Sequence, residues 1–465
     1  MHILDDFLSQ ASSFIWGWPL IILLFGTHIY LTVRLKFIQR YIGQGIRISL
    51  RRKKEGSGDI SQFGALTTSL AATIGTGNIV GVAAAVAAGG PGAVLWMWLT
   101  GVFGISTKYA EALLAVKYRV KNEAGQMSGG PMYVLERGMK MRPLGLLFAG
   151  FTAIAAFGIG NMVQANAISQ LVEQTFSVKP YVTGAVLMLM TGLVILGGIR
   201  SISRTCERLV PFMAIVYVLG CLVILAINIE TIPDTVALIF TSAFSGHAAV
   251  GGFIGAGMRE VIRFGVARGL FSNESGLGSA PIVAAAAQTR TPARQALVSA
   301  TGTFWDTVVV CAITGIVVVS SGDWVQGLSG TELTKSAFSH IPYVGPAVLT
   351  MGLLTFVFST ILGWSYYGEK AAEYLFGTGV VRYYRYLWVA AVMVGSVATL
   401  PMVWNFADIA NGLMAVPNLI SLLVLAPVVV SETKKHFQEE MLMRDVPEDT
   451  FDPRFEKSAG AAETN

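Results

Sequence analysis

Long apolar segments, separated by short polar connections, make up most of this chain of 465 residues. Each has about the 20 residues or more that a helix needs to cross the hydrocarbon core of a bilayer. Charged residues account for only 13% of the chain, roughly half of their share in soluble proteins. The sequence therefore predicts an all-α membrane protein and excludes a disordered chain, a secreted disulfide scaffold and a nucleic-acid-binding protein. The eleven predicted transmembrane spans are residues 14–33, 63–90, 92–116, 145–176, 181–199, 209–229, 250–288, 294–320, 345–376, 384–404 and 408–431.

Positive charges are concentrated in alternate connections between these spans. The connector 34–54 holds eight Lys and Arg residues, and such charges mark the cytoplasmic side of a membrane. With the N-terminus outside and the C-terminus cytoplasmic, the inner segments hold 27 of the 33 Lys and Arg residues. Lys108 falls late in an inward-running span and is counted with them. We expect residues 34–54 to lie along the lipid headgroups and the chain from Ser431 onward to be a partly disordered cytoplasmic tail.

Two apolar segments contain residues that would interrupt a helix, at 71–79 and at 271–281. Glycine loosens a helix, and Ser, Thr and Asn can bond the freed backbone groups. Asn78, Asn273 and Glu274 are costly inside a membrane unless they have a partner or a function. Once the first span is set aside, the two breaks fall in the first and the sixth of ten spans. This offset of five is odd, so the two broken spans cross the membrane in opposite directions. This arrangement is typical of inverted repeats whose broken helices meet at the membrane midplane, where helix ends bind ions and carboxylates.

Polar residues also interrupt two other apolar segments. Asn161 and Gln164 lie within 145–176, and at least one amide there is expected to face the protein interior. Ser359 and Thr360 lie within 345–376. Adjacent hydroxyls usually bond back to their own helix, but opposite a broken helix they become candidate sodium ligands.

Four longer motifs carry a family resemblance: GTGNI at 75–79, GGPGAVLWMW at 89–98, SGGPMY at 128–133 and FSNESGLGSAP at 271–281. They resemble the alanine or glycine:cation symporter family, and the likeness extends from about residue 14 to 431. It implies a sodium-coupled importer of alanine and glycine in the inner membrane of a prokaryotic cell. It also implies a leucine-transporter-type fold, a 5+5 inverted repeat with one extra N-terminal helix. The expected division is an N-terminal helix and connector (1–62), a first repeat (63–229), a second repeat (230–431) and a tail (432–465).

The resemblance further implies the residues of the site. The sodium ligands would be the carbonyl groups of Ala71 and Ile74 and the hydroxyls of Ser359 and Thr360. The substrate-binding residues would be Thr73, Gly75, Thr76, Gly77, Asn78, Gln164, Phe271, Ser272, Asn273, Thr360 and Trp364. The backbone around Gly75 would face the substrate carboxylate, and Trp364 would close the side-chain end of the pocket. Sodium, alanine or glycine and the lipid bilayer are the expected partners, without a cofactor, a nucleic acid or an obligate protein partner.

Other functions remain as alternatives. A proton-coupled amino-acid permease would use Glu274 as its titrating group, although we expect Glu274 to pair with Arg268. The arginines Arg259, Arg263 and Arg268 form either an amphipathic outer segment, as we expect, or the lining of a vestibule. A channel is a further alternative. A membrane-embedded enzyme is disfavoured because the chain lacks HExxH, a Cys/His cluster and a phosphate-binding GxxxxGK[ST] loop.

Overall fold

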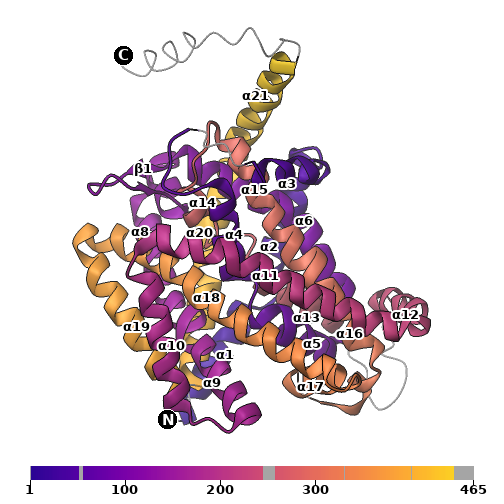
Figure 1. The fold of residues 1–465 in the computed structure, drawn as a ribbon. Helices are drawn as coiled ribbons and strands as arrows, with labels where there is room; N and C mark the ends of the chain where they lie inside the picture. The colour runs from indigo at the N-terminus through magenta and orange to yellow at the C-terminus, as the bar shows by residue number, and fades with distance from the viewer. Residues whose placement is uncertain (1, 52–55, 245–256, 329, 399–400, 445–465) are drawn as a thin grey trace, which may run out of the picture.

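The computed structural model describes residues 2–51, 56–244, 257–328, 330–398 and 401–444, and it is almost entirely helical (Figure 1). The α-helices are α1 (His2–Ile15), α2 (Trp18–Arg34), α3 (Ile42–Ser49), α4 (Gln62–Thr73), α5 (Val82–Gly89), α6 (Ala93–Lys117), α7 (Pro131–Tyr133), α8 (Arg142–Phe157), α9 (Val163–Phe176), α10 (Pro180–Ile195), α11 (Gly198–Ile227), α12 (Ile232–Phe244), α13 (Met258–Asn273), α14 (Pro281–Ala284), α15 (Pro292–Thr303), α16 (Ala312–Ser320), α17 (Gly330–Ser339), α18 (Val344–Phe376), α19 (Val381–Val397), α20 (Pro401–Val424) and α21 (Ala426–Arg444). Short 3-10 helices are η1 (Ile38–Tyr41), η5 (Ile229–Thr231), η7 (Asp323–Gln326) and η8 (Thr378–Val380), and π-helical turns are η2 (Gly77–Gly81), η3 (Val134–Gly138), η4 (Gly158–Met162) and η6 (Phe304–Cys311). Strands β1 (Val120–Lys121) and β2 (Met127–Ser128) form one antiparallel hairpin.

Two interrupted helices lie beside two continuous ones. The first interrupted helix is α4 with α5, and the second is α13 with α14. The long helix α18 packs against α4, α8, α9 and α11, whereas α6 packs against α2, α13 and α15. The break of each interrupted helix therefore has a continuous helix as its neighbour.

The first break follows α4. This helix begins where the Ser61 side chain accepts a hydrogen bond from the Gly64 N–H, an ordinary N-cap. It ends at Thr73 because Ile74 has an extended backbone. The chain resumes as the π-helical turn η2, and the two halves are bent by 57°. The interruption predicted at 71–79 is confirmed.

The second break follows α13. Glu274 adopts a left-handed conformation with φ of 54°, and Gly276 and Gly278 have φ of 90° and 88°. Glycine adopts such angles without steric cost, so the two glycines permit the turn that separates Asn273 from α14. The interruption predicted at 271–281 is confirmed as well.

Most predicted spans correspond to helices of the structure. Within the described residues, six helices are long and apolar enough to cross a membrane, and the bent pair α4 and α5 makes a seventh. α10 is a shorter apolar helix at the position of the predicted span 181–199. Residues 250–256 of one predicted span and 399–400 of another lie outside the described residues. The total of eleven spans stays a prediction.

Several predicted boundaries are wrong. α11 starts at Gly198, eleven residues before the predicted span 209–229, and it includes Arg200, Arg204 and Arg208. These arginines recur every four residues, so they lie along one face of the helix instead of in a loop. The helices α12 and α17 were not predicted at all.

The C-terminal tail also differs from the prediction, because α21 continues to Arg444. Its polar residues have partners on α6: Thr433 shares a hydrogen bond of 2.9 Å with Tyr109, and Glu432 forms an ion pair of 2.7 Å with Lys117. These contacts stabilise as a helix the first part of a tail that composition predicts to be partly disordered. Residues 445–465 lie outside the described residues.

The helix ends divide the molecule into two faces. In Figure 1, α3, α14, the hairpin β1–β2 and α21 lie at one end, and the N-terminus, α9 and α17 lie at the other. The basic connector therefore lies at the same end as the C-terminal helix. We refer to the first as the basic face and to the second as the opposite face.

Candidate functional site

The first break faces two hydroxyl groups of α18. The Ser359 hydroxyl lies 3.2 Å from the Ala71 carbonyl oxygen, and the Thr360 hydroxyl lies 3.4 Å from the Ile74 carbonyl oxygen. Each hydroxyl lies closer still to the Phe356 carbonyl oxygen of its own helix, at 2.8 Å and 3.0 Å, so each has two acceptors for its single proton. Ala71, Ile74, Ser359 and Thr360 are all buried. The structure thus brings together the four oxygen groups that the sequence predicted as a set, from segments more than 280 residues apart. Hydroxyl and unwound carbonyl oxygens are the groups that bind sodium at broken helices.

Glycine at the first break leaves room beside these oxygens. A Cβ atom on Gly75 would lie 2.8 Å from the Thr360 hydroxyl oxygen and 3.9 Å from the amide oxygen of Gln164. That amide oxygen is buried and has no hydrogen-bond partner among the described residues, while the Gln164 amide nitrogen donates to the Ile159 carbonyl group at 2.9 Å. A free acceptor therefore points toward the break.

A cavity of about 440 Å³ leads to this region. Its lining includes Thr76, Gly77 and Phe271 from the predicted substrate site. Farther out it is lined by Gln174 and Lys335, from α9 and α17 at the opposite face. The other predicted substrate residues do not line this cavity, and most of them are buried behind it: Thr73, Asn78, Gln164, Ser272, Asn273, Thr360 and Trp364 are each at most 8% exposed.

Asn78 joins the two breaks through a carboxylate that the sequence analysis did not identify. Its amide oxygen accepts a hydrogen bond from the Gly75 N–H at 2.9 Å, and its amide nitrogen donates to the Asp306 carboxylate at 2.7 Å. Asp306 also accepts from the hydroxyls of Ser272 at 3.1 Å and Thr307 at 2.6 Å. This acid is 1% exposed and lies on the π-helical turn η6. The signal available in the sequence was an acidic residue inside the apolar segment 294–320.

The hydrogen bonds of Asn273 and Thr73 are local, apart from one that joins Asn273 to α6. The amide oxygen of Asn273 accepts from the Ser275 N–H at 2.9 Å, and its amide nitrogen donates to the Thr100 hydroxyl at 3.4 Å. The Thr73 hydroxyl donates back to its own helix at Ser69. In this conformation both side chains support the breaks.

Trp364 lies one turn beyond Thr360 on α18, as the sequence predicts. Its side chain is 1% exposed, and a Cβ atom on Gly160 would lie only 2.3 Å from the Trp364 Cβ atom. Gly160 therefore allows α18 to approach η4 closely. The indole ring also contacts Tyr367 edge-on at 5.5 Å between centroids. The predicted role of Trp364 as the end of the pocket stays a prediction.

The expected pairing of Glu274 with Arg268 is wrong. Arg268 lines the cavity, and its electrostatic partner is Asp408 on α20, at the same cavity. Glu274 instead accepts a hydrogen bond of 2.5 Å from Ser279. The left-handed turn at Glu274 separates its side chain from the Arg268 face of α13. Each of the two alternatives for the arginines applies to a different residue. Arg259 stacks on Trp18 near the start of α13, whereas Arg268 lines the cavity, as the vestibule alternative predicts.

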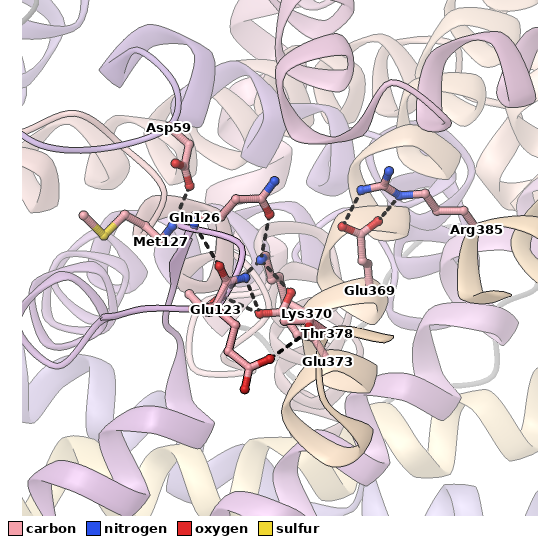
Figure 2. A network of polar contacts seen from close by, with 11 residues as sticks. Asp59, Glu123, Gln126, Met127, Glu369, Lys370, Glu373, Thr378 and Arg385 are labelled. Carbon is pink, nitrogen blue, oxygen red and sulfur yellow. Dashed lines mark hydrogen bonds and ion pairs between the residues drawn. The ribbon is translucent and has the colours of Figure 1, made fainter. Parts of the chain in front are cut away.

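A buried polar network lies at the basic face, near the end of α18 (Figure 2). The Lys370 ammonium group lies 2.8 Å from the Glu373 carboxylate and 3.0 Å from the Ser128 hydroxyl of the hairpin. Asn122 and Ser128 donate to the other oxygen of Glu373 at 2.9 Å and 2.8 Å. The Met127 N–H donates to Asp59, which precedes α4, at 2.7 Å. We call this set the hairpin network.

A second ion pair lies beside the hairpin network. Arg385 of α19 binds both carboxylate oxygens of Glu369, at 2.6 Å and 2.8 Å (Figure 2). The C-terminal end of α18 is therefore connected to the hairpin, to the segment before α4 and to α19. The helix that carries Ser359 and Thr360 is thus the helix that the network holds at the basic face.

Residues 1–450 match the sodium:alanine symporter family. The chain belongs to this family. It is 52% identical over 443 residues to the sodium/alanine symporter AgcS of Methanococcus maripaludis, with 92% of this chain and 97% of AgcS covered. It is 53% identical over 440 residues to a transporter of Haemophilus influenzae, with 94% and 96% covered. Among solved structures, MhsT in complex with L-phenylalanine has a TM-score of 0.57 at 14% identity, over 81% of this chain and 98% of MhsT.

These comparisons establish the class of the protein. The fold is of the leucine-transporter type, as the sequence predicts, and the family is one of sodium-coupled membrane transporters. The relatives are bacterial and archaeal.

Proposed function

We propose that this symporter carries alanine and glycine together with sodium into a prokaryotic cell, across its inner membrane. The observation that carries the proposal is the convergence of two break carbonyls and two α18 hydroxyls. The name of the relative AgcS, a sodium/alanine symporter, supports the choice of ions and substrate.

The sodium ion would bind between the first break and α18. Each hydroxyl would turn its proton away and present a lone pair, so that Ser359, Thr360, Ala71 and Ile74 supply four oxygen ligands. Because these groups belong to the end of α4, to the break that follows it and to α18, a bound ion would hold the two helices together. Sodium binding would thereby fix the shape of the adjoining substrate site.

The amino acid would bind beside this ion. Its carboxylate would accept hydrogen bonds from the N–H groups of Thr76 and Gly77, where a helix N-terminus favours negative charge. Its ammonium group would donate to the amide oxygen of Gln164, which has no other partner among the described residues. Phe271 would line the side-chain region, and Trp364 would set the limit on substrate size.

Transport would follow from alternating access of this site to the two faces. The cavity at Thr76 and Gly77 would be the outward route, and the hairpin network would be the closure of the cytoplasmic route. Orientation with the basic face in the cytoplasm accords with the positions of Lys and Arg. The N-terminus is then outside and the C-terminus cytoplasmic.

The test is uptake of radiolabelled alanine into proteoliposomes that contain the purified protein. We expect accumulation under an inward sodium gradient and none when choline replaces sodium. An inward proton gradient without sodium is the matched control for a proton-coupled permease. Uptake driven by protons alone would contradict the proposal, and equilibration without accumulation would indicate a channel.

A further inference from the structure

One face of α6 lies against the second break. A Cβ atom on Gly104 would lie 3.1 Å from the Ser275 hydroxyl oxygen. One turn later the Thr107 hydroxyl is hydrogen-bonded to His28 of α2 at 2.8 Å. At Glu111 the carboxylate accepts a hydrogen bond from the Gly276 N–H at 3.0 Å. Lys108 is one turn from both Gly104 and Glu111, so it lies on this same face.

Lys108 is buried without a direct partner. The residue is 2% exposed, and its ammonium nitrogen has no hydrogen bond or ion pair with any described residue. The helix continues for nine residues to Lys117, so Lys108 does not reach the basic face as the charge count assumed. A buried ammonium group is costly unless nearby charge compensates it.

Carboxylates supply the charge that faces Lys108. Glu111, Glu274 and Asp306 all interact with it electrostatically. Glu111 is further held by the Asn418 amide at 2.7 Å, and its second oxygen has no partner among the described residues. Lys108 forms no ion pair with these acids in the described part of the chain, so its charge acts on them over a longer distance.

Glu274 connects this cluster to the proposed substrate site. It lies at the left-handed turn of the second break and is 5% exposed. Its carboxyl group lies near the Trp364 indole and near Tyr367, both on α18. The charge on Lys108 therefore acts on a group that lies between the break and the pocket wall.

We propose that Lys108 is a positioning residue, whose ammonium group balances Glu274 at the second break and thereby holds the break against Trp364. The proposal rests on the proposed transport function. The first break would then face an exchangeable cation, sodium. The second break would face a cation that is fixed to the chain, the Lys108 ammonium group. Removing only the ammonium group leaves the Glu274 carboxylate buried without compensation, whereas removing both members of the pair leaves no uncompensated charge at the break itself.

The experiment compares Lys108→Met, Glu274→Gln and the double variant in proteoliposomes. Methionine keeps the length and packing of the lysine stem but removes its charge. We expect Lys108→Met to lower sodium-driven alanine uptake at least tenfold. The double variant should recover at least a third of the uptake of the unmodified protein, because the carboxylate at the break is removed together with its cation. The other two acids keep their own hydrogen-bond donors, which are Gly276 and Asn418 for Glu111, and Asn78, Ser272 and Thr307 for Asp306. Lys117→Met is the matched control, since Lys117 lies on the same helix in an exposed ion pair, and its uptake should change less than twofold.

Thermal unfolding in detergent, followed by fluorescence-detected gel filtration, gives a second readout that needs no transport. We expect the midpoint to fall for Lys108→Met and to rise again in the double variant. Equal losses in the single and double variants, including failure of both to fold, would overturn the pairing. So would unchanged uptake in Lys108→Met. Absence of sodium-driven uptake in the unmodified protein would overturn the proposed function, while the unfolding midpoints would still test the pairing.

Discussion

The substitution Lys370→Met tests whether the hairpin network keeps the basic face closed. Lys370 is 1% exposed and binds Glu373 at 2.8 Å and Ser128 at 3.0 Å. The substitution leaves the Glu373 carboxylate buried without its cation. When the face opens, water reaches this carboxylate. The substitution therefore destabilises the closed conformation more than the open one.

The magnitude follows from the partners that remain. Breaking a buried ion pair costs about 3–5 kcal/mol when one charge is left uncompensated. Glu373 keeps hydrogen bonds from Asn122 at 2.9 Å and Ser128 at 2.8 Å, so we expect a smaller loss, of about 2 kcal/mol. That corresponds to a shift of about 30-fold toward the conformation open at the basic face.

Cysteine labelling measures this shift. Ser69→Cys places a thiol on α4, about one turn before the first break and almost fully buried. A membrane-impermeant maleimide is added to inside-out vesicles, and the labelling rate is compared with and without Lys370→Met. The protein without Ser69→Cys gives the background from the native cysteines, all three of which are buried.

We expect the labelling rate at position 69 to rise about 30-fold in Lys370→Met, in step with the population of the open conformation. Lys117→Met is the control, because an exposed pair of this kind contributes about 0–1 kcal/mol. A rate within twofold of the parent, with normal amounts of protein in the membrane, would refute the role assigned to the hairpin network.

Three further predictions concern the first break and the pocket. Ser359→Ala and Thr360→Ala should each raise the sodium concentration for half-maximal uptake by about 5- to 150-fold, because a lost buried polar partner costs about 1–3 kcal/mol; sodium titration of alanine uptake measures this, and unchanged curves in both would remove the pair from the site. Gly75→Ala should abolish uptake at normal expression, since its Cβ atom would lie 2.8 Å from the Thr360 hydroxyl oxygen; full activity would show that the glycine serves packing only. Trp364→Ala should weaken alanine binding and let leucine compete with alanine, whereas continued exclusion of leucine with normal alanine uptake would exclude Trp364 from the pocket wall.

The sequence predicts those parts of the site that depend on local composition. Glycine and polar residues within an apolar segment have a direct physical consequence, and both breaks are present where they were expected. The family resemblance also predicted contacts between distant segments, such as the one between Ser359 and Ala71. The first break and its oxygen groups could therefore be placed before the structure was known.

Other parts of the site and of the fold depend on contacts with distant residues, which a single sequence does not reveal. Asp306 and Lys108 each lie in an apolar segment, and nothing local shows that one binds Asn78 or that the other faces Glu274. The expected pair of Glu274 and Arg268 failed because α13 ends at Asn273 and the chain turns at Glu274, away from the helix face of Arg268. The helices α11 and α21 extend beyond their apolar cores since hydrogen bonds and ion pairs stabilise polar turns that hydropathy assigns to loops.

The central claim, that sodium and alanine cross the membrane together, is tested most directly by the flux of sodium itself. Proteoliposomes with the purified protein are given radioactive sodium outside, at equal total sodium on both sides, and an inward gradient of alanine. We predict that alanine increases the entry of sodium, that glycine does the same, and that Thr360→Ala reduces this increase. Alanine uptake without any alanine-dependent entry of sodium would contradict the account.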